Sequence, residues 1–356
     1  MFTSAERERL RADLLVQARR DQRIASGAIT GSAAGGCEDD WSDIDLAFGV
    51  TTGISVPEVL SDWTAQMYDR NAAVHHVDTR FENWFYRTFL LSNTLQVDLA
   101  FVPWEHFQAL GPRFNVVFGA AREPAHFPHP TSAKMSATCL AAIDCGSACI
   151  SKGALWPADY FLGVARDNAL MSACLKHDLP YQHGRGFDLL PAETKAAYEN
   201  AFALTLDGNE LSRALCVIRE SMGESARAPT CRMAELPDVD RAIGLAWLYA
   251  LHVRSCISRN RLWQGEYMVR GMRDNTLGAA RLGLGSHSGS QLYPELVPEQ
   301  IESRFRHTRL RALNLDELTR AFRLLLEYLS SEILLAGVPR SKLLVQTISA
   351  FIGFSA

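Results

Sequence analysis

The sequence lacks any run of eighteen apolar residues, although 47% of its 356 residues are hydrophobic. A membrane-spanning helix needs about twenty such residues in succession, so no membrane partner is predicted. A secretory signal is also missing, because residues 3–20 are charged and amphipathic. These two absences predict a soluble, cytoplasmic protein.

Positive charge and paired cysteines are scarce as well. The 36 basic residues are outnumbered by 40 acidic ones, and the resulting net charge of −4 argues against nucleic acid as a partner. The eight cysteines form no Cys-x-x-Cys pair and have no regular spacing. They are therefore interpreted as small apolar fillers of a reduced protein. The length predicts two or three domains.

What the sequence does contain is a short apolar run over residues 24–30 that ends in Gly31 and Ser32. Glycine lets the backbone turn sharply and approach a ligand closely. A Gly-Ser turn between a strand and a helix offers free N–H groups and a hydroxyl to a phosphate. We therefore expect Gly31 and Ser32 to bind the phosphates of a substrate.

Acidic residues follow this turn in a pattern that favours metal binding. Alternation over residues 43–48 places Asp43 and Asp45 on one face of a strand, and Asp98 interrupts a later apolar strand over residues 95–102. Carboxylates held close together are costly unless a cation lies between them, and oxygen ligands suit Mg²⁺. A phosphate-binding turn beside a metal site indicates phosphoryl or nucleotidyl transfer.

Gly31-Ser32, Asp43-Ile44-Asp45 and Asp98 resemble the signature of the nucleotidyltransferase superfamily with a polymerase-β-like catalytic domain. The plan of the chain is most similar to the aminoglycoside and lincosamide nucleotidyltransferases. The resemblance implies one or two Mg²⁺ ions and a nucleoside triphosphate, with ATP expected. It also implies a hydroxyl of a small molecule, such as one of these antibiotics, as the acceptor of the nucleoside monophosphate, with pyrophosphate released.

The same resemblance implies a cation and sometimes a carboxylate base from the helices that follow. Lys152, which we place at the start of a helix, is the first candidate for the cation. Arg185, in the basic loop 183–186, is the second. Asp159 is a weaker candidate for the base, so the general base is left open between Asp98 and Asp159.

An internal repeat occupies the second half of the chain. Residues 149–220 align without a gap onto residues 256–327, so that Arg166-Asp167-Asn168 recurs as Arg273-Asp274-Asn275. The 72 aligned positions hold twenty identities, against about four by chance at average residue usage. This similarity predicts a tandem duplication. Because one catalytic site needs only one copy, features kept in both copies are interpreted as structural.

The expected fold is α+β, with a mixed sheet and helices at the N-terminus followed by two all-α domains. The predicted bounds are 1–123 for the catalytic domain and 132–230 and 238–345 for the helical domains, with a proline-rich linker over residues 121–131. Inside the first domain we expect helices over 3–22 and 56–70 and strands over 24–30, 43–48, 74–78, 84–91, 95–102 and 115–118. The duplication predicts a monomer.

Two other functions remain open at this stage. The enzyme could nucleotidylate a protein or an RNA, although the acidic balance argues against RNA. Alternatively, the chain could be a scaffold without catalytic activity whose duplicated helices bind a partner. A broken acid triad would favour the scaffold, and the triad in this sequence is complete.

Overall fold

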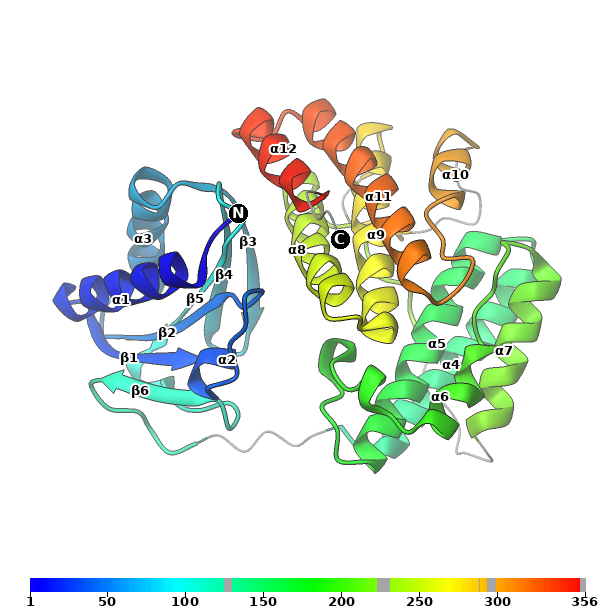
Figure 1. Cartoon of the computed structure of the whole chain (residues 1–356), viewed down its shortest axis with the longest axis horizontal. Helices are drawn as coiled ribbons and strands as arrows, with labels where there is room; N and C mark the ends of the chain where they lie inside the picture. Colours follow the sequence, from blue (N-terminus) through cyan, green and yellow to red (C-terminus); the bar gives the residue numbers. More distant parts are fainter. Residues whose placement is uncertain (125–129, 223–230, 288, 293–298, 353–356) are drawn as a thin grey trace. The chain divides into compact units, whose positions relative to one another are not determined.

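A computed structural model describes residues 1–124, 130–222, 231–287, 289–292 and 299–352, and they fall into two compact units (Figure 1). The first unit comprises residues 1–128 and 337–356, and the second comprises residues 129–336. Part of the predicted linker and the end of the predicted first helical domain, 125–129 and 223–230, lie outside the described residues. In the described ranges no helix combines the length and the apolar character that crossing a membrane requires.

The first unit is built on a six-stranded mixed sheet with the strand order β3-β4-β5-β2-β1-β6. Strands β2 and β5 are parallel, and the other neighbouring strands are antiparallel. The strands are β1 Ile24–Thr30, β2 Ile44–Val50, β3 Ala73–Phe81, β4 Trp84–Leu91, β5 Gln96–Pro103 and β6 Phe114–Phe118.

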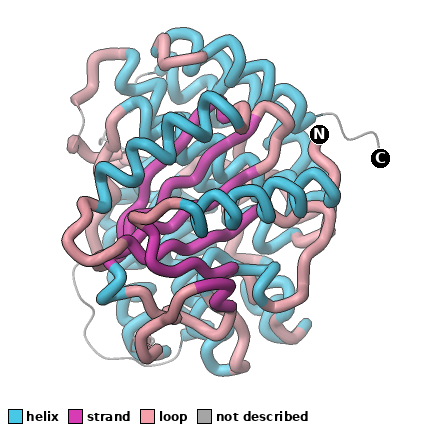
Figure 2. Tube along the Cα trace, turned by 90° about the vertical axis from the view of Figure 1, so that its left-hand side faces the viewer, coloured by secondary structure: helices cyan, strands magenta, loops and turns pink. Residues whose placement is uncertain are grey.

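Helices α1 (Ser4–Arg20) and α3 (Val56–Arg70) cover one face of this sheet (Figure 2). Side chains of both helices share a core with alternate residues of β2 and β5, and Phe48, Trp63 and Phe101 pack ring against ring at its centre. Helix α1 begins with the predicted capping box, in which Thr3 and Glu6 satisfy each other's backbone N–H groups.

Strand alternation sends the remaining residues of β2 and β5 to the opposite face. Ile44, Leu46 and Phe48 belong to the core under α1 and α3, so Asp45 and Ala47 face away from it. On β5 the same alternation separates Val97 and Leu99 from Asp98. The acidic side chains are thus kept out of the main core by the register of the two strands.

Residues 337–352 return to the first unit, although the sequence assigned 337–345 to the second helical domain. Helix α12 (Ser341–Ser349) packs against β3, an edge strand. Just before it, Arg340 donates to the carbonyl oxygen of Ala73 at 2.7 Å and lies over the ring of Tyr68. Covering an edge strand with a helix shields it from pairing with another chain.

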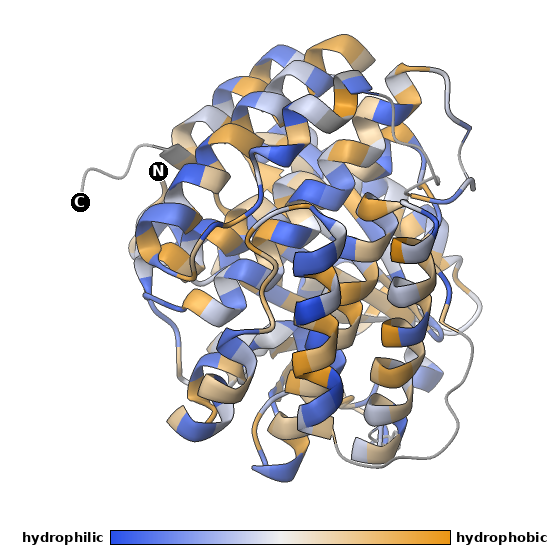
Figure 3. Ribbon diagram, turned by 90° about the vertical axis from the view of Figure 1, so that its right-hand side faces the viewer, coloured by the Kyte–Doolittle hydropathy of each residue, from blue (hydrophilic) through white to orange (hydrophobic). Residues whose placement is uncertain are grey.

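The second unit is all helical, and its helix bounds repeat. The bounds of α4, α5 and α6 plus 107 give those of α8, α9 and α10, and α11 begins 107 residues after α7. These helices are α4 Ser132–Ser151, α5 Leu155–Lys176, α6 Ala192–Glu199, α7 Gly208–Met222, α8 Val239–Ser258, α9 Leu262–Gly283, α10 Glu299–Arg306 and α11 Leu315–Ala336. Figure 3 shows hydrophobic and hydrophilic residues mixed along the helices that face the viewer.

The chain is therefore α+β, with the mixed sheet in its N-terminal region and helices in the part that follows. The repeated helix bounds agree with the repeat in the sequence. Tandem duplication as the origin of both repeats stays an inference.

Candidate active site

Three carboxylates converge on the sheet face opposite α1 and α3. Asp43 ends the loop before β2, Asp45 lies in β2, and Asp98 lies in β5 directly beside Asp45 in the parallel register. One ligand oxygen from each of the three lies within 4.8 Å of the others, and all three residues are partly exposed. The convergence predicted from the sequence is confirmed, while the catalytic role of these acids stays a prediction.

Gln96 orients the third acid, and sequence reasoning missed it. Its side-chain Nε2 donates to Oδ1 of Asp98 at 3.2 Å and to Oδ2 at 3.0 Å. Gln96 is buried, and on a strand it shares a face with the residue two positions later. That spacing was a signal in the sequence. Because the amide donates to both oxygens, it fixes the direction of the carboxylate of Asp98.

The Gly-Ser turn lies against the second acid. Gly31 begins α2 (Gly31–Ala34), has a φ of +63°, and leaves so little room that a Cβ placed on it would stand 1.9 Å from Oδ2 of Asp45. Only glycine meets both conditions. Within the described part of the chain, the buried Oγ of Ser32 has no hydrogen-bond partner. A buried hydroxyl in that state suits a ligand oxygen, because an unpaired polar group is costly.

The acidic loop before Asp43 is held in place by helix α1. Arg7 donates from Nη1 to the carbonyl oxygens of Asp39 and Ser42 and pairs through Nε with Glu38 at 3.2 Å. Arg11, one turn later, also pairs with Glu38, at 2.6 Å. Arg7 is only 3% exposed, so its bonds are shielded from water. This loop is therefore a structural support for Asp43, and not merely a solvated acidic turn.

Replacing Arg7 by leucine is expected to destabilise the first unit by about 3 kcal/mol, because buried carbonyl oxygens would lose their donor and Glu38 one partner. The matched control is Arg11→Leu on the same helix. It removes an ion pair that is more exposed than that of Arg7, and it should lower the free energy of unfolding by less than about 1 kcal/mol. Urea unfolding followed by tryptophan fluorescence measures both free energies. Equal losses in the two variants would contradict the supporting role of Arg7.

A cation that the sequence did not indicate lies beside the same turn. Arg113 precedes β6, and its Nε is 3.5 Å from the point that a Cβ on Gly35 would occupy. Gly35 is the C-cap of α2. Strand β6 pairs with β1, which carries the turn, and this pairing brings Arg113 close. The first unit therefore supplies its own arginine near the predicted phosphate-binding residues.

The two cations predicted from the helical part belong to the second unit. The prediction that Lys152 lies at the start of a helix is wrong. In the structure Lys152 is the C-cap of α4. The helix ends there because Gly153 adopts a φ of +73°, the left-handed conformation that terminates helices. Arg185 is exposed at the end of a short 3₁₀ turn. Phosphate binding by Lys152 and Arg185 stays a prediction.

Asp159, the weaker candidate for the base, is paired inside the helical unit. Arg309 donates to its two oxygens at 2.8 and 3.3 Å, and Arg273 donates to one of them at 3.3 Å. Burial raises the pKa of Asp159, but the charges of Arg309 and Arg273 outweigh burial and lower this pKa below its usual value. A buried carboxylate held by two arginines is a structural ion pair and a poor proton acceptor.

The donor set formed by Asp43, Asp45 and Asp98 fits a divalent metal ion of the Mg²⁺ type. Its ligands are carboxylate oxygens, and such hard oxygen ligands are those that Mg²⁺ prefers. Three carboxylates within 4.8 Å repel one another, so a cation between them lowers their energy. In the described ranges this is the one group of three or more acidic, histidine or cysteine side chains close enough to hold a metal.

Comparison with known proteins gives little beyond this geometry. No family model and no curated protein matches the sequence. Among solved structures, an aminoglycoside 6-adenyltransferase from Bacillus subtilis is similar with a TM-score of 0.23 and 10% identity, over 100% of this chain and 94% of that one. Similarity at this level establishes neither a shared fold nor a shared reaction.

Proposed function

We propose that the first unit is the catalytic domain of a distant member of the nucleotidyltransferases. In this proposal a nucleoside monophosphate, AMP from ATP as the expected case, moves onto a hydroxyl of a small molecule and pyrophosphate is released. The observation that carries the proposal is the convergence of Asp43, Asp45 and Asp98 beside Gly31 and the unpartnered hydroxyl of Ser32. Phosphate transfer needs both a place for metal and donors for phosphate oxygens.

Each residue has a role that follows from its place. Asp43 and Asp45, with Asp98 in a two-metal arrangement, would hold Mg²⁺, which when bound neutralises phosphate charge and orients the triphosphate. Gly31 lets the backbone approach a phosphate oxygen, and the Ser32 hydroxyl donates to one. Arg113 stands near the same turn and adds a cation to the candidates Lys152 and Arg185.

At phosphorus the transfer forms one bond and breaks one, and the proton of the acceptor hydroxyl passes to a base. The acceptor hydroxyl oxygen attacks the α-phosphorus, the bond from this phosphorus to the bridging oxygen breaks, and the electron pair leaves with pyrophosphate. Where Asp43 and Asp45 alone hold a single Mg²⁺, Asp98 takes the hydroxyl proton, and the hydrogen bonds from Gln96 orient its carboxylate. Asp159 is not needed for this step.

The acceptor that we propose is a hydroxylated small molecule of the aminoglycoside or lincosamide kind. The acidic net charge of the chain suits a cationic acceptor such as an aminoglycoside. The duplicated helices within one chain support a monomer as the active form.

Pyrophosphate release tests the proposal. We expect pyrophosphate to be released only when Mg²⁺, a nucleoside triphosphate and an acceptor are all present. The four nucleoside triphosphates are tested in turn, with ATP favoured, against a panel of aminoglycosides and lincosamides. Calorimetry with ATP, with and without Mg²⁺, is the companion measurement, because it detects the nucleotide site even when the panel misses the acceptor. Absence of Mg²⁺-dependent binding by all four nucleotides would overturn the proposal and leave a scaffold.

A further inference from the structure

The two repeated halves of the helical unit exchange ion pairs reciprocally. Asp159 in α5 pairs with Arg273 in α9 at 3.3 Å, and Glu266 in α9 pairs with Arg166 in α5. Asp159 and Glu266 are equivalent positions of the repeat, as are Arg166 and Arg273. Each half therefore offers the other an acid and an arginine from the same two positions of the repeat, which is the contact pattern of a two-fold symmetric dimer.

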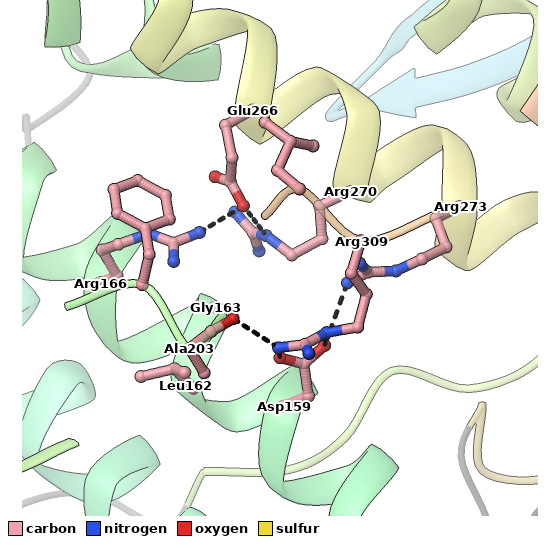
Figure 4. A pocket seen from close by; sticks show the side chains of 11 residues that line it. Asp159, Leu162, Gly163, Arg166, Ala203, Glu266, Arg270, Arg273 and Arg309 are labelled. Atoms are coloured by element: carbon pink, nitrogen blue, oxygen red, sulfur yellow. Dashed lines mark hydrogen bonds and ion pairs between the residues drawn. The ribbon is translucent and has the colours of Figure 1, made fainter. Parts of the chain in front are cut away.

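A small polar cavity lies where these pairs meet (Figure 4). It has about 30 Å³ open to water, room for about two water molecules. Its lining draws on both halves, because five residues of the first half line it together with their five equivalents in the second. These are Asp159, Gly163, Arg166, Phe202 and Ala203 with Glu266, Arg270, Arg273, Arg309 and Leu310.

The charges that face this cavity are unequal. Four arginines line it, against the two carboxylates of Asp159 and Glu266. Asp167 balances Arg270 from outside the lining, through bonds of 2.6 and 2.8 Å, and Asp274 lies 3.9 Å from Nε of Arg273. The cluster as a whole is therefore neutral, which lets it form without a ligand, while the surface that a ligand would meet is positive.

Guanidinium donors also exceed carboxylate acceptor positions around the cavity, and the carbonyl oxygen of Ala203 takes one donor, from Arg309. Four guanidinium groups carry about twenty N–H donors, and four carboxylates offer roughly sixteen acceptor positions. Among the residues that the structure describes, Nε of Arg270 is buried without a hydrogen-bond partner, and Oε1 of Glu266, with which it forms an ion pair, is 3.6 Å away. The arginine itself is 9% exposed, so water reaches this donor poorly.

The guanidinium of Arg166 is the best placed to recognise a ligand. Its Cζ lies 4.1 Å from the centre of the Phe202 ring, which holds the planar group in one orientation. Arg166 forms an ion pair with Glu266, which also pairs with Arg270. An arginine whose plane is fixed by an aromatic ring suits bidentate recognition of an oxyanion.

We propose that this cavity, formed by both repeated halves, binds a small oxyanion, either free inorganic phosphate or the phosphate group of a larger molecule. The excess of guanidinium donors supplies the partners for its oxygens, and the size of the cavity admits one anionic group. Binding there bridges α5 and α9, so the ligand stabilises the association of the two halves. The proposal is independent of the chemistry proposed for the first unit.

Calorimetric titration of the full-length protein with inorganic phosphate, in the absence of Mg²⁺, tests the site. We expect one saturable site in the wild type and at least a tenfold loss of affinity, about 1.4 kcal/mol, in Arg166→Gln. The matched control is Arg219→Gln on α7, which removes the same charge from an exposed pair with Asp144 and should leave binding unchanged. Circular dichroism checks the folding of each variant, and Arg166→Lys, which keeps the charge without the planar fork, should bind with intermediate affinity.

A parallel titration with glycerol phosphate identifies the source of the anion. Binding as tight as that of inorganic phosphate assigns the site to phosphate groups of larger molecules, and binding of inorganic phosphate alone assigns it to the free ion. If the wild-type protein shows no saturable binding of either probe at millimolar concentration, the proposal is overturned without reference to the variants. Equal losses in Arg166→Gln and Arg219→Gln would also overturn it, because binding would then depend on overall charge.

Discussion

Replacing Asp45 by asparagine is expected to lower the turnover number by roughly 10³-fold, equivalent to about 4 kcal/mol of transition-state stabilisation. Asp45 lies beside Asp98 on the neighbouring strand and within reach of Asp43, so its loss removes the central ligand of the three. The substitution keeps the shape of the side chain and removes its charge. Pyrophosphate release and calorimetry with Mg²⁺ and ATP measure the loss of turnover and of metal-dependent binding.

The stability of the same variant should move in the opposite direction. Without metal, three close carboxylates repel one another, and neutralising one of them relieves that repulsion. We therefore expect the melting temperature of Asp45→Asn to equal or exceed that of the wild type. Asp13→Asn, on the exposed side of α1, is the charge-matched control and should leave turnover unchanged. Normal turnover in Asp45→Asn would remove the basis of the proposed function.

Gly31→Ala should have the second largest effect, with activity lowered by about 100-fold. The new Cβ would stand 1.9 Å from Oδ2 and 2.6 Å from the carboxyl carbon of Asp45, so that carboxylate must move away from its partners. The φ of +63° adds strain of roughly 1–2 kcal/mol for alanine. Kinetic assays and thermal unfolding measure the two contributions.

Gly36→Ala separates strain from displacement. Gly36 has nearly the same backbone angle, a φ of +62°, and a Cβ placed there meets nothing within 4 Å. We expect it to lose a similar amount of stability through strain while keeping activity near that of the wild type. If Gly36→Ala lost as much activity as Gly31→Ala, the contact between Gly31 and Asp45 could not be the cause.

Local features of the first unit could be predicted from the sequence because their causes are local. The capping box of Thr3 and Glu6, the bounds of α3 and the alternation in β2 depend on residues within a few positions of one another. The same holds for Gly31, because the turn at this position is a local feature that favours glycine. Such features can be recognised without knowledge of the tertiary fold.

Pairing between distant segments could not be predicted in the same way. The sequence placed Asp98 on a strand but gave no register, and it is the parallel pairing of β2 with β5 that brings Asp98 beside Asp45. Arg7 and Arg113 carry no local pattern that separates them from arginines on the surface, because the groups that they contact lie far along the chain. For the same reason nothing local showed that Arg340 contacts Ala73.

The repeat was visible in the sequence, but the contacts made by the residues that both copies share were not. Their interpretation as structural agrees with the buried pairs of Arg273 with Asp159 and of Arg166 with Glu266. The alignment could not show that each pair joins one half to the other. It also could not show that Gly153 would place Lys152 at a helix end.

The return of residues 337–352 to the first unit has a consequence for synthesis on the ribosome. The sheet and α1 emerge early, but the helix that covers the β3 edge is translated only after residues 129–336. At roughly 5–20 residues per second, the nascent sheet waits on the order of tens of seconds with that edge unprotected. During this interval the growing chain is open to pairing with a neighbouring polypeptide or to capture by a chaperone.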